Sequence, residues 1–168
     1  MNTGGSAIDI HIRSAGPKDF DLIWKATIET VWQDLPPEER AQLDRHSFED
    51  HFRPHAQRVI ESQENAVFIA ETPAGATAGY IVVGGATSML SPLRFGFVYD
   101  VWVAPEFRRR GVARRLLDRA VGWCRSSGYG SLRLEVNARN APARALYAAT
   151  GFVEERLSLR KVLQLGAT

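Results

Sequence analysis

The pattern of hydrophobic positions changes its period within one stretch of the chain, Phe97 to Cys124. From Phe97 to Val103 most residues are β-branched or aromatic, which predicts a strand. Pro105 ends the strand, because proline has no N–H to donate to a sheet. Beyond it, the apolar positions take helical spacing, at Ala113, Leu116, Leu117, Ala120 and Cys124. The stretch therefore predicts a strand, a turn and a helix.

The N-terminal half of the chain contains segments with the hydrophobic period of a strand and segments with that of a helix. Alternation predicts a first strand at residues 8–12, three helices follow, and two strands then form an antiparallel hairpin. We expect Asp19 and Ser47 to be helix N-caps, and Pro54 to kink or start the third helix. The predicted helices are residues 20–32, 38–44 and 47–62, and the hairpin strands are residues 67–71 and 78–83. A loop that begins with Gly84 and Gly85 and runs to Pro92 is expected to lead into the central strand.

The C-terminal part predicts a second strand–helix unit. Residues 132–137 alternate as a strand, which a right-handed crossover should place parallel to residues 97–103. A short helix at residues 141–150 follows, and residues 152–163 are expected to be a closing hairpin or a bent strand. No linker or repeat interrupts this order, so we expect residues 8–168 to form a single domain behind a flexible tail, residues 1–7.

Composition and charge narrow the function classes. The chain has 168 residues, 45% of them hydrophobic, and a formal charge of +2, which suits one α/β domain and is too small to imply nucleic-acid binding. No apolar run is long enough to span a bilayer, and a lone cysteine is compatible with a reducing compartment, so we expect a cytoplasmic protein. Cys124 should be buried rather than nucleophilic. His51 and His55 have no convincing third ligand, so no metal site is expected.

The turn between the predicted strand and helix suits an anion. Gly111 lets the backbone approach a bound group closely, and the first N–H groups of the helix have no partners within it. The helix dipole and a local cluster of arginines add positive charge there. The clustered arginines are Arg108, Arg109, Arg110, Arg114, Arg115 and Arg119. This turn is therefore a candidate phosphate site.

Two motifs occur in order along the chain. The first is Val103, Pro105, Arg108, Gly111 and Ala113; the second runs from Leu134 to Phe152 and includes Asn140, Ala143, Leu146, Tyr147, Gly151 and Phe152. Together they resemble the GCN5-related N-acetyltransferase superfamily. The resemblance implies an α/β fold with a mixed sheet of six or seven strands, helices on both faces and splayed parallel strands four and five. It also implies transfer of an acetyl group from acetyl-CoA to a primary amine, with no metal.

The resemblance also assigns residues to acetyl-CoA. The turn would surround the pyrophosphate, the backbone of the preceding strand would pair with the pantetheine arm, and an N–H near Val103 would face the thioester oxygen. Asn140 would bond the pantetheine or the adjoining backbone, although it could equally cap the helix at residues 141–150. The implied residues are Val101, Val103, Arg108, Arg109, Arg110, Gly111, Val112, Ala113, Arg114 and Asn140.

Three side chains are candidates for moving protons. Glu135 matches the base of the ribosomal-protein N-terminal acetyltransferases, or else it pairs with Arg133 or Arg139. Asp100, on the central strand, is the second candidate base, or else a structural hydrogen-bond partner or a contact to the substrate amine. Tyr147 is the candidate acid for the departing thiolate, or else a packed tyrosine.

The acceptor amine is open at this point. The resemblance places it near residues 24–62 and 84–95, where aromatic and acidic residues would suit a cationic amine. These residues are Trp24, Trp32, Asp34, Glu38 and Glu39. A non-catalytic acyl-CoA-binding or interaction module is the alternative, neither nucleic acid nor membrane is an expected partner, and a homodimer is left open.

Overall fold

The computed structural model of the chain describes residues 8–163. The predicted tail, residues 1–7, lies outside the described residues. The chain divides into two compact units, and the boundary in the sequence lies between Asn137 and Ala138. Each unit is described by itself below. A single domain spanning residues 8–168 therefore stays a prediction.

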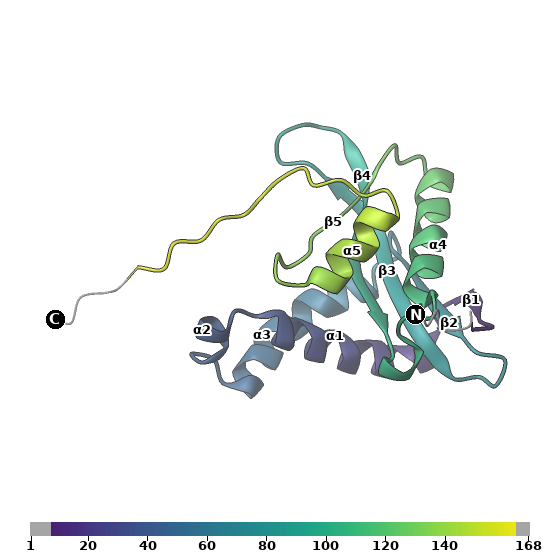
Figure 1. The fold of residues 1–168 in the computed structure, drawn as a ribbon, viewed down its shortest axis with the longest axis horizontal. Helices are drawn as coiled ribbons and strands as arrows, with labels where there is room; N and C mark the ends of the chain where they lie inside the picture. The colour runs from purple at the N-terminus through teal and green to yellow at the C-terminus, as the bar shows by residue number, and fades with distance from the viewer. Residues whose placement is uncertain (1–7, 164–168) are drawn as a thin grey trace, which may run out of the picture. The chain divides into compact units, whose positions relative to one another are not determined.

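The first unit is built on one mixed sheet, in which the strands follow chain order (Figure 1). The strands are β1 (His11–Ser14), β2 (Ala66–Glu71), β3 (Thr77–Thr87), β4 (Arg94–Val103) and β5 (Leu132–Leu134). The first three pairings are antiparallel and the last, β4 with β5, is parallel. The mixed sheet and its parallel last pair are thus confirmed.

The predicted strand count was too high. The sheet has five strands instead of six or seven, because residues 152–163 form neither helix nor strand, contrary to prediction. In contrast, β3 continues through Gly84 and Gly85, which were predicted to lie in a loop. Side chains explain these glycines: a Cβ at Gly84 would collide with Asn65, and one at Gly85 with Tyr129. Glycine is needed there for space rather than for a turn.

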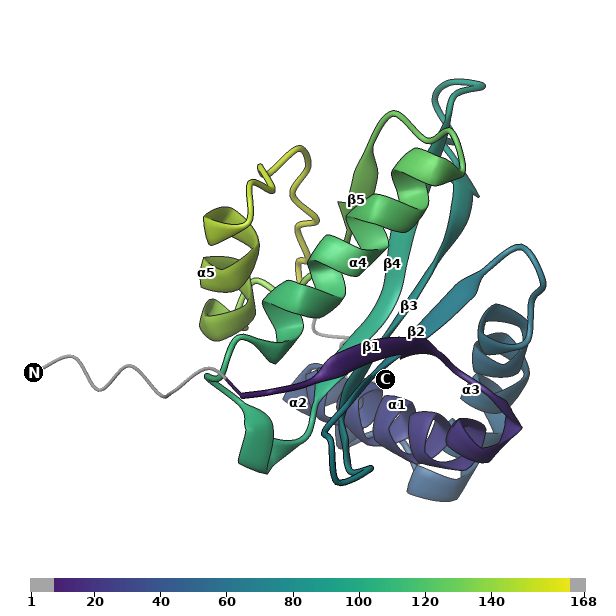
Figure 2. The same cartoon turned by 90° about the vertical axis from the view of Figure 1, so that its right-hand side faces the viewer.

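Helices cover both faces of this sheet (Figure 2). The helix α4 packs on one face, and α1 and α3 lie on the other. The helices of the first unit are α1 (Phe20–Asp34), α2 (Pro37–Arg40), α3 (Arg45–Ile60) and α4 (Val112–Ser126), with short 3-10 turns at Pro17–Asp19 and Pro105–Phe107. The second unit contains α5 (Ala141–Ala149). The predicted helix at residues 38–44 is therefore only a single turn.

Alternation along β3 divides the core of the first unit into two layers. Tyr80 and Val82 pack against Ile23 of α1 and Ile60 of α3. Ile81, between them in sequence, points to the opposite face, where α4 buries its own apolar stripe. The stripe consists of Val112, Leu116, Leu117, Ala120 and Cys124. The two faces of the sheet are therefore both buried.

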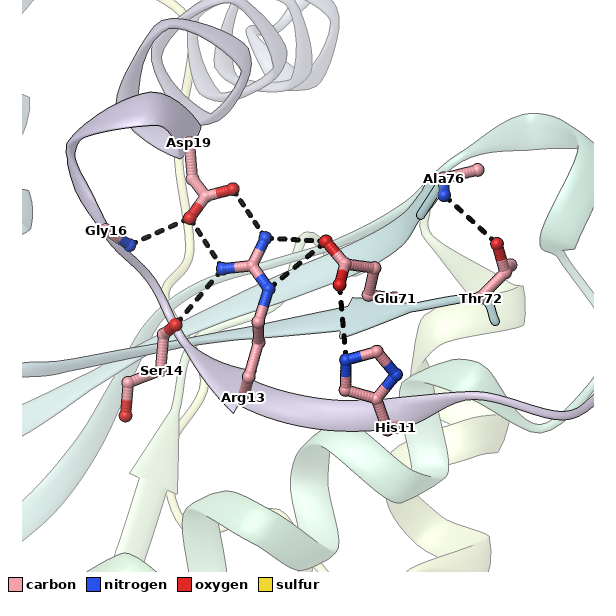
Figure 3. Close-up of polar contacts among 8 residues, drawn as sticks. All are labelled: His11, Arg13, Ser14, Gly16, Asp19, Glu71, Thr72 and Ala76. Carbon is pink, nitrogen blue, oxygen red and sulfur yellow. Dashed lines mark hydrogen bonds and ion pairs between the residues drawn. The ribbon is translucent and has the colours of Figure 1, made fainter. Parts of the chain in front are cut away.

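Of the two predicted N-caps, Asp19 is confirmed in position and Ser47 was wrong. Asp19 directly precedes α1, but its side chain does not cap the helix. Its carboxylate instead accepts two hydrogen bonds from Arg13 and one from the N–H of Gly16 (Figure 3). The cap of α3 is Asp44, whose carboxylate accepts from the N–H of Ser47. Arg13 thus binds the side chain of Asp19, and Asp44 rather than Ser47 supplies the cap of α3.

Candidate active site

An irregularity in β4 determines which face of the sheet carries the side chain of Asp100. Val82 and Val83 are adjacent in β3, yet they pair with Asp100 and Val98, so Tyr99 is an additional residue in β4. Val98 faces α4 together with Val83, whereas Asp100 shares the face of Val82, which packs against α1 and α3. In a regular strand Val98 and Asp100 would point the same way. The bulge therefore turns Asp100 towards α1 and α3.

The carboxylate of Asp100 is held by two hydroxyl groups. Thr27 Oγ1 donates to Asp100 Oδ2 at 2.6 Å, and Tyr80 Oη donates to the same oxygen at 2.8 Å. Burial raises the pKa of Asp100, and the two hydroxyls and the N–H of Val101 oppose this rise. Burial and the charge of Asp100 also raise the pKa of Tyr80, so its hydroxyl keeps its proton and can donate it to this bond.

Asp100 lines an apolar cavity between the sheet and the two helices. The cavity has a volume of about 170 Å³. Its lining residues are Thr27, Phe52, His55, Ala56, Val59, Ile60, Val82, Tyr99 and Asp100. A wider chamber of about 390 Å³ shares His55, Val59 and Tyr99 with it and is otherwise mainly polar. A carboxylate with a raised pKa in an apolar cavity is typical of a functional site.

The parallel strands β4 and β5 separate just beyond the bulge. Their ladder ends where Val98 pairs with Leu134, while β4 continues to Val103. The N–H of Ala104 donates to Ala78 of the β3 side, so by alternation the backbone groups of Val101 and Val103 point away from β3. The Val103 carbonyl accepts a hydrogen bond from Arg108 Nε. The exposed strand edge could therefore pair with an extended amide-containing ligand.

The turn after β4 has a backbone suited to an anion. Arg109 has φ 62° and Gly111 has φ 80°, and this left-handed conformation is costly for arginine, by about 1–2 kcal/mol. Such turns direct successive N–H groups into a concavity that binds anions. Gly111 begins α4, and no side chain caps the first turn of this helix. Arg109, Arg110 and Arg114 are exposed around the turn, and Ala113 is half-buried.

Two of the clustered arginines have structural roles instead. Arg115 donates to the carbonyl of Ile10 at 2.6 Å, which ties the start of the chain to α4. The guanidinium of Arg119 lies 4.1 Å from the centre of the Phe68 ring. The positive patch around the turn therefore contains fewer than the six arginines that the sequence predicted for it.

The second unit holds two predicted site residues. Asn140 is the N-cap of α5, where its side chain accepts from the N–H of Ala143 at 3.2 Å, as one of the two predicted roles requires. Tyr147 is half-buried in α5, and its ring lies edge-on to Phe152 with 5.7 Å between ring centres. A role in catalysis stays a prediction for both residues.

The predicted acceptor residues do not line either cavity. Trp24 stacks on Phe52 and is covered by Arg53. Trp32 packs similarly against Phe48 and is covered by Arg45. The other predicted base, Glu135, is exposed just after the last residue of β5 and lines neither cavity. The structure therefore brings only Asp100, of the two candidate bases, into a cavity.

Sequence reasoning missed the residues that hold Asp100. Thr27 lies on the buried side of α1 and Tyr80 within an apolar strand, so neither stood out in the sequence as a candidate site residue. A hydroxyl at each of these buried positions was the available signal, because a buried hydroxyl needs a partner. Cys124 is buried beneath Gly96, as expected, and burial raises the pKa of its thiol.

The structure thus combines two parallel strands that separate with an adjacent turn whose backbone conformation suits an anion. The family model described as "Acetyltransferase (GNAT) family" matches residues 24–152. Because this match covers most of the sequence, the chain belongs to that family.

Individual relatives agree with this assignment. The [ribosomal protein bS18]-alanine N-acetyltransferase of Salmonella typhimurium is 42% identical over 57 residues, 34% of this chain and 38% of that protein. The N-acetyltransferase YhfO of Bacillus subtilis is 30% identical over 57% of this chain and 64% of its own length. The chain thus matches less than two thirds of either relative.

Solved structures confirm the fold. A Pyrococcus furiosus protein described as an acetyl transferase superposes with a TM-score of 0.77 at 19% identity, over 92% of this chain and 100% of that one. The aminoglycoside acetyltransferase AAC(6')-Iy, in complex with a bisubstrate analogue of CoA, has a TM-score of 0.67 at 20% identity, over 93% and 99% of the two chains. Within residues 8–163, no helix is long and apolar enough to cross a membrane.

Proposed function

We propose that this chain is an N-acetyltransferase that transfers the acetyl group of acetyl-CoA directly to a primary amine. The observation that carries the proposal is the bulge at Tyr99. It places a carboxylate in a cavity on one side of β4, three positions before Val103, whose backbone lies on the free edge of the same strand. Proton acceptor and acyl site would then belong to one rigid element.

The residues present fit acetyl-CoA. The turn at Arg108–Gly111 and the uncapped start of α4 would hold the pyrophosphate, with Arg109, Arg110 and Arg114 supplying positive charge. The free edge of β4 at Val101 and Val103 would take the place of a missing strand pairing for the amide-rich arm. Arg108 Nε already donates to the Val103 carbonyl, so these two groups have a structural partner as well.

The chain's groups would act on the amine and on the developing oxyanion. Asp100 would accept a proton from the attacking amine at Oδ1, because the two hydroxyls bind Oδ2. Attack of the amine on the thioester carbonyl would form the C–N bond and an oxyanion, and collapse of this intermediate would then break the C–S bond. Tyr147 stays the candidate donor of the proton that the departing thiolate gains. The N–H of Val103 would stabilise the oxyanion, and a donor of this kind is typically worth about 3 kcal/mol.

Asp100 is a better candidate base than Glu135 for a physical reason. A raised pKa makes a carboxylate a stronger proton acceptor. Glu135 is exposed and lies outside both cavities, so it would act only through a chain of water molecules. The relatives support an amine acceptor, since their names specify a protein alanine and the 6'-amino group of aminoglycosides.

Calorimetry with acetyl-CoA and a thiol-release assay with a panel of amines test the proposal. We expect binding and turnover, and Gly111→Asp should abolish binding through charge repulsion with the phosphates. Gly122→Asp is the matched control, because Gly122 lies on the exposed side of α4 with open space around it. It should bind normally.

Tyr147→Phe separates chemistry from binding. Turnover should fall while the affinity for acetyl-CoA stays nearly unchanged; unaltered turnover would remove Tyr147 from the mechanism. Binding of acetyl-CoA without turnover of any amine would instead favour a non-catalytic acyl-CoA-binding module. Normal binding by Gly111→Asp would refute the phosphate site.

A further inference from the structure

We propose that the acceptor is a primary amine that carries one compact apolar group, no larger than about a phenyl ring. The proposal rests on the N-acetyltransferase function above and names its substrate class. It follows from the size, the lining and the charge of the cavity that contains Asp100.

The size of the cavity limits the acceptor. A buried apolar cavity of about 150 Å³ is large enough to bind benzene. The inner cavity here has a similar volume, about 170 Å³, and its lining includes Ala56, Ile60 and Val82, which are all buried. A branched aliphatic or phenyl group fits a space of this size.

The lining of the cavity selects for apolar surface. Phe52, Ala56, Val59, Ile60 and Val82 present no hydrogen-bonding side-chain atom. A hydroxyl or second amine placed against them would lose its bonds to water without replacement, at a cost of about 1–3 kcal/mol for each group. An apolar group of the same size gains from the same contact, at about 25 cal/mol for each Å² removed from water.

The charge of the residues that line the cavity suits an acceptor with a single ammonium group. Asp100 is the single carboxylate among the residues that line this cavity. One ammonium can pair with it on entry, whereas a second would be buried without a counter-ion. Polyamines and aminoglycosides, which carry several ammonium groups, are therefore poor occupants of this cavity.

The outer chamber would accommodate a polar remainder of the acceptor. It adjoins the inner cavity at His55, Val59 and Tyr99 and is lined further by Arg58, Ser62, Glu64 and Asn65. Substituents that extend from the amine on this side stay solvated. The apolar group must enter the inner cavity, so selection acts on that group.

The first test compares acceptors. The kcat/KM values of benzylamine and isobutylamine, expressed per neutral amine, should exceed those of spermidine and kanamycin by at least tenfold. Higher values for spermidine or kanamycin, in an enzyme that turns over acetyl-CoA, would overturn this inference and leave the proposed function intact. Absence of acetyl-CoA binding would overturn both.

The second test fills the cavity. Ala56→Leu should lower kcat/KM for benzylamine at least tenfold and leave that for methylamine nearly unchanged. Gln57→Leu is the matched control on the exposed side of the same helix, and it should change neither. Val59→Phe, at a half-buried position shared by both chambers, repeats the test if Ala56→Leu fails to fold. Equal losses for both amines in the filling variants would contradict the assignment of the cavity.

Discussion

Two aspartates of the first unit are fixed by hydrogen bonds, and their surroundings give them opposite properties. Asp19 accepts from Arg13 and from a backbone N–H, and the pKa of its carboxyl is lowered chiefly by Arg13. Asp100 accepts from two neutral hydroxyls, and burial raises its pKa. Within residues 8–163, its hydrogen-bonding partners include no cation.

The difference shows how a sequence separates structural carboxylates from reactive ones. Arg13 joins Asp19 to Glu71 of the next strand, and His11 contacts the other oxygen of Glu71 (Figure 3). Every acid in that cluster already has a cationic partner in place. Asp100 is instead oriented without being neutralised, so an incoming ammonium can supply the missing charge.

Replacing each aspartate in turn with asparagine should give the largest difference between the two sites, in turnover and in melting temperature. Asp100→Asn should lower turnover by about 10²–10⁴-fold, the usual contribution of a general base. It should also raise the melting temperature near neutral pH. The folded-state pKa of Asp100 is raised, so ionisation costs stability above the ordinary pKa of a carboxyl, and the amide removes that cost.

Asp19→Asn is the matched control, in which stability should change in the opposite direction and turnover should be nearly unaffected. The melting temperature should fall, because Arg13 loses a charged partner, while turnover stays within about twofold of the parent protein. Thiol release and thermal unfolding measure both properties of both variants. A loss of turnover in Asp19→Asn equal to that in Asp100→Asn would contradict the distinction between a structural Asp19 and a reactive Asp100.

Removal of Arg13 should have the next largest effect. Arg13→Met should destabilise the protein by about 2 kcal/mol, between the values for exposed and buried ion pairs, because its side chain is 23% exposed. The folded-state pKa of Asp19 is lowered, so its contribution is present above about pH 4 and is lost as the pH falls further. Urea unfolding at several pH values should show the difference between the proteins shrinking below that point.

The hydroxyl of Thr27 provides a finer test. Thr27→Val removes a donor that stabilises the charged form of Asp100, so the pKa of Asp100 should rise further. The acidic limb of the kcat/KM profile should then move to higher pH, because the base must be deprotonated. His55, Tyr80 and Tyr99 face the same carboxylate or its cavity and are unchanged. Thr27→Ser should restore the parent profile, and a limb that does not move in Thr27→Val would exclude Asp100 as its origin.

The smallest effect should come from the rim of the Arg13 cluster. The side chain of His11 is 56% exposed where it contacts Glu71, and exposed ion pairs contribute little. His11→Ala should leave the midpoint of urea unfolding unchanged within error. A clear loss would mean that the cluster depends on its outer charges as well as on Arg13.

Periodicity was sufficient for most of the fold. It predicted the central strand, α4 and the parallel strand that follows, because each carries a strong apolar pattern of its own. It failed at β3, where Gly84 and Gly85 indicated a loop and are instead required by the side chains of Asn65 and Tyr129. It failed also at residues 152–163, which were expected to form a closing hairpin or a bent strand and form neither helix nor strand.

The site was only partly accessible from sequence. The anion-binding turn could be predicted, because its glycine and arginines are contiguous. The orientation of Asp100 could not, because it depends on a one-residue bulge that leaves no mark in the alternation of β4. Thr27 is separated from Asp100 by 73 positions and Tyr80 by 20, so no local pattern connects them.

The central claim, that the two aspartates differ in ionisation, can be measured directly. Carbon-detected NMR of the side-chain carboxyls across a pH titration, assigned with Asp19→Asn and Asp100→Asn, gives each pKa separately. The account predicts a pKa above the ordinary value of about 3.9 for Asp100 and one below it for Asp19. A pKa for Asp100 as low as that of Asp19 would contradict it.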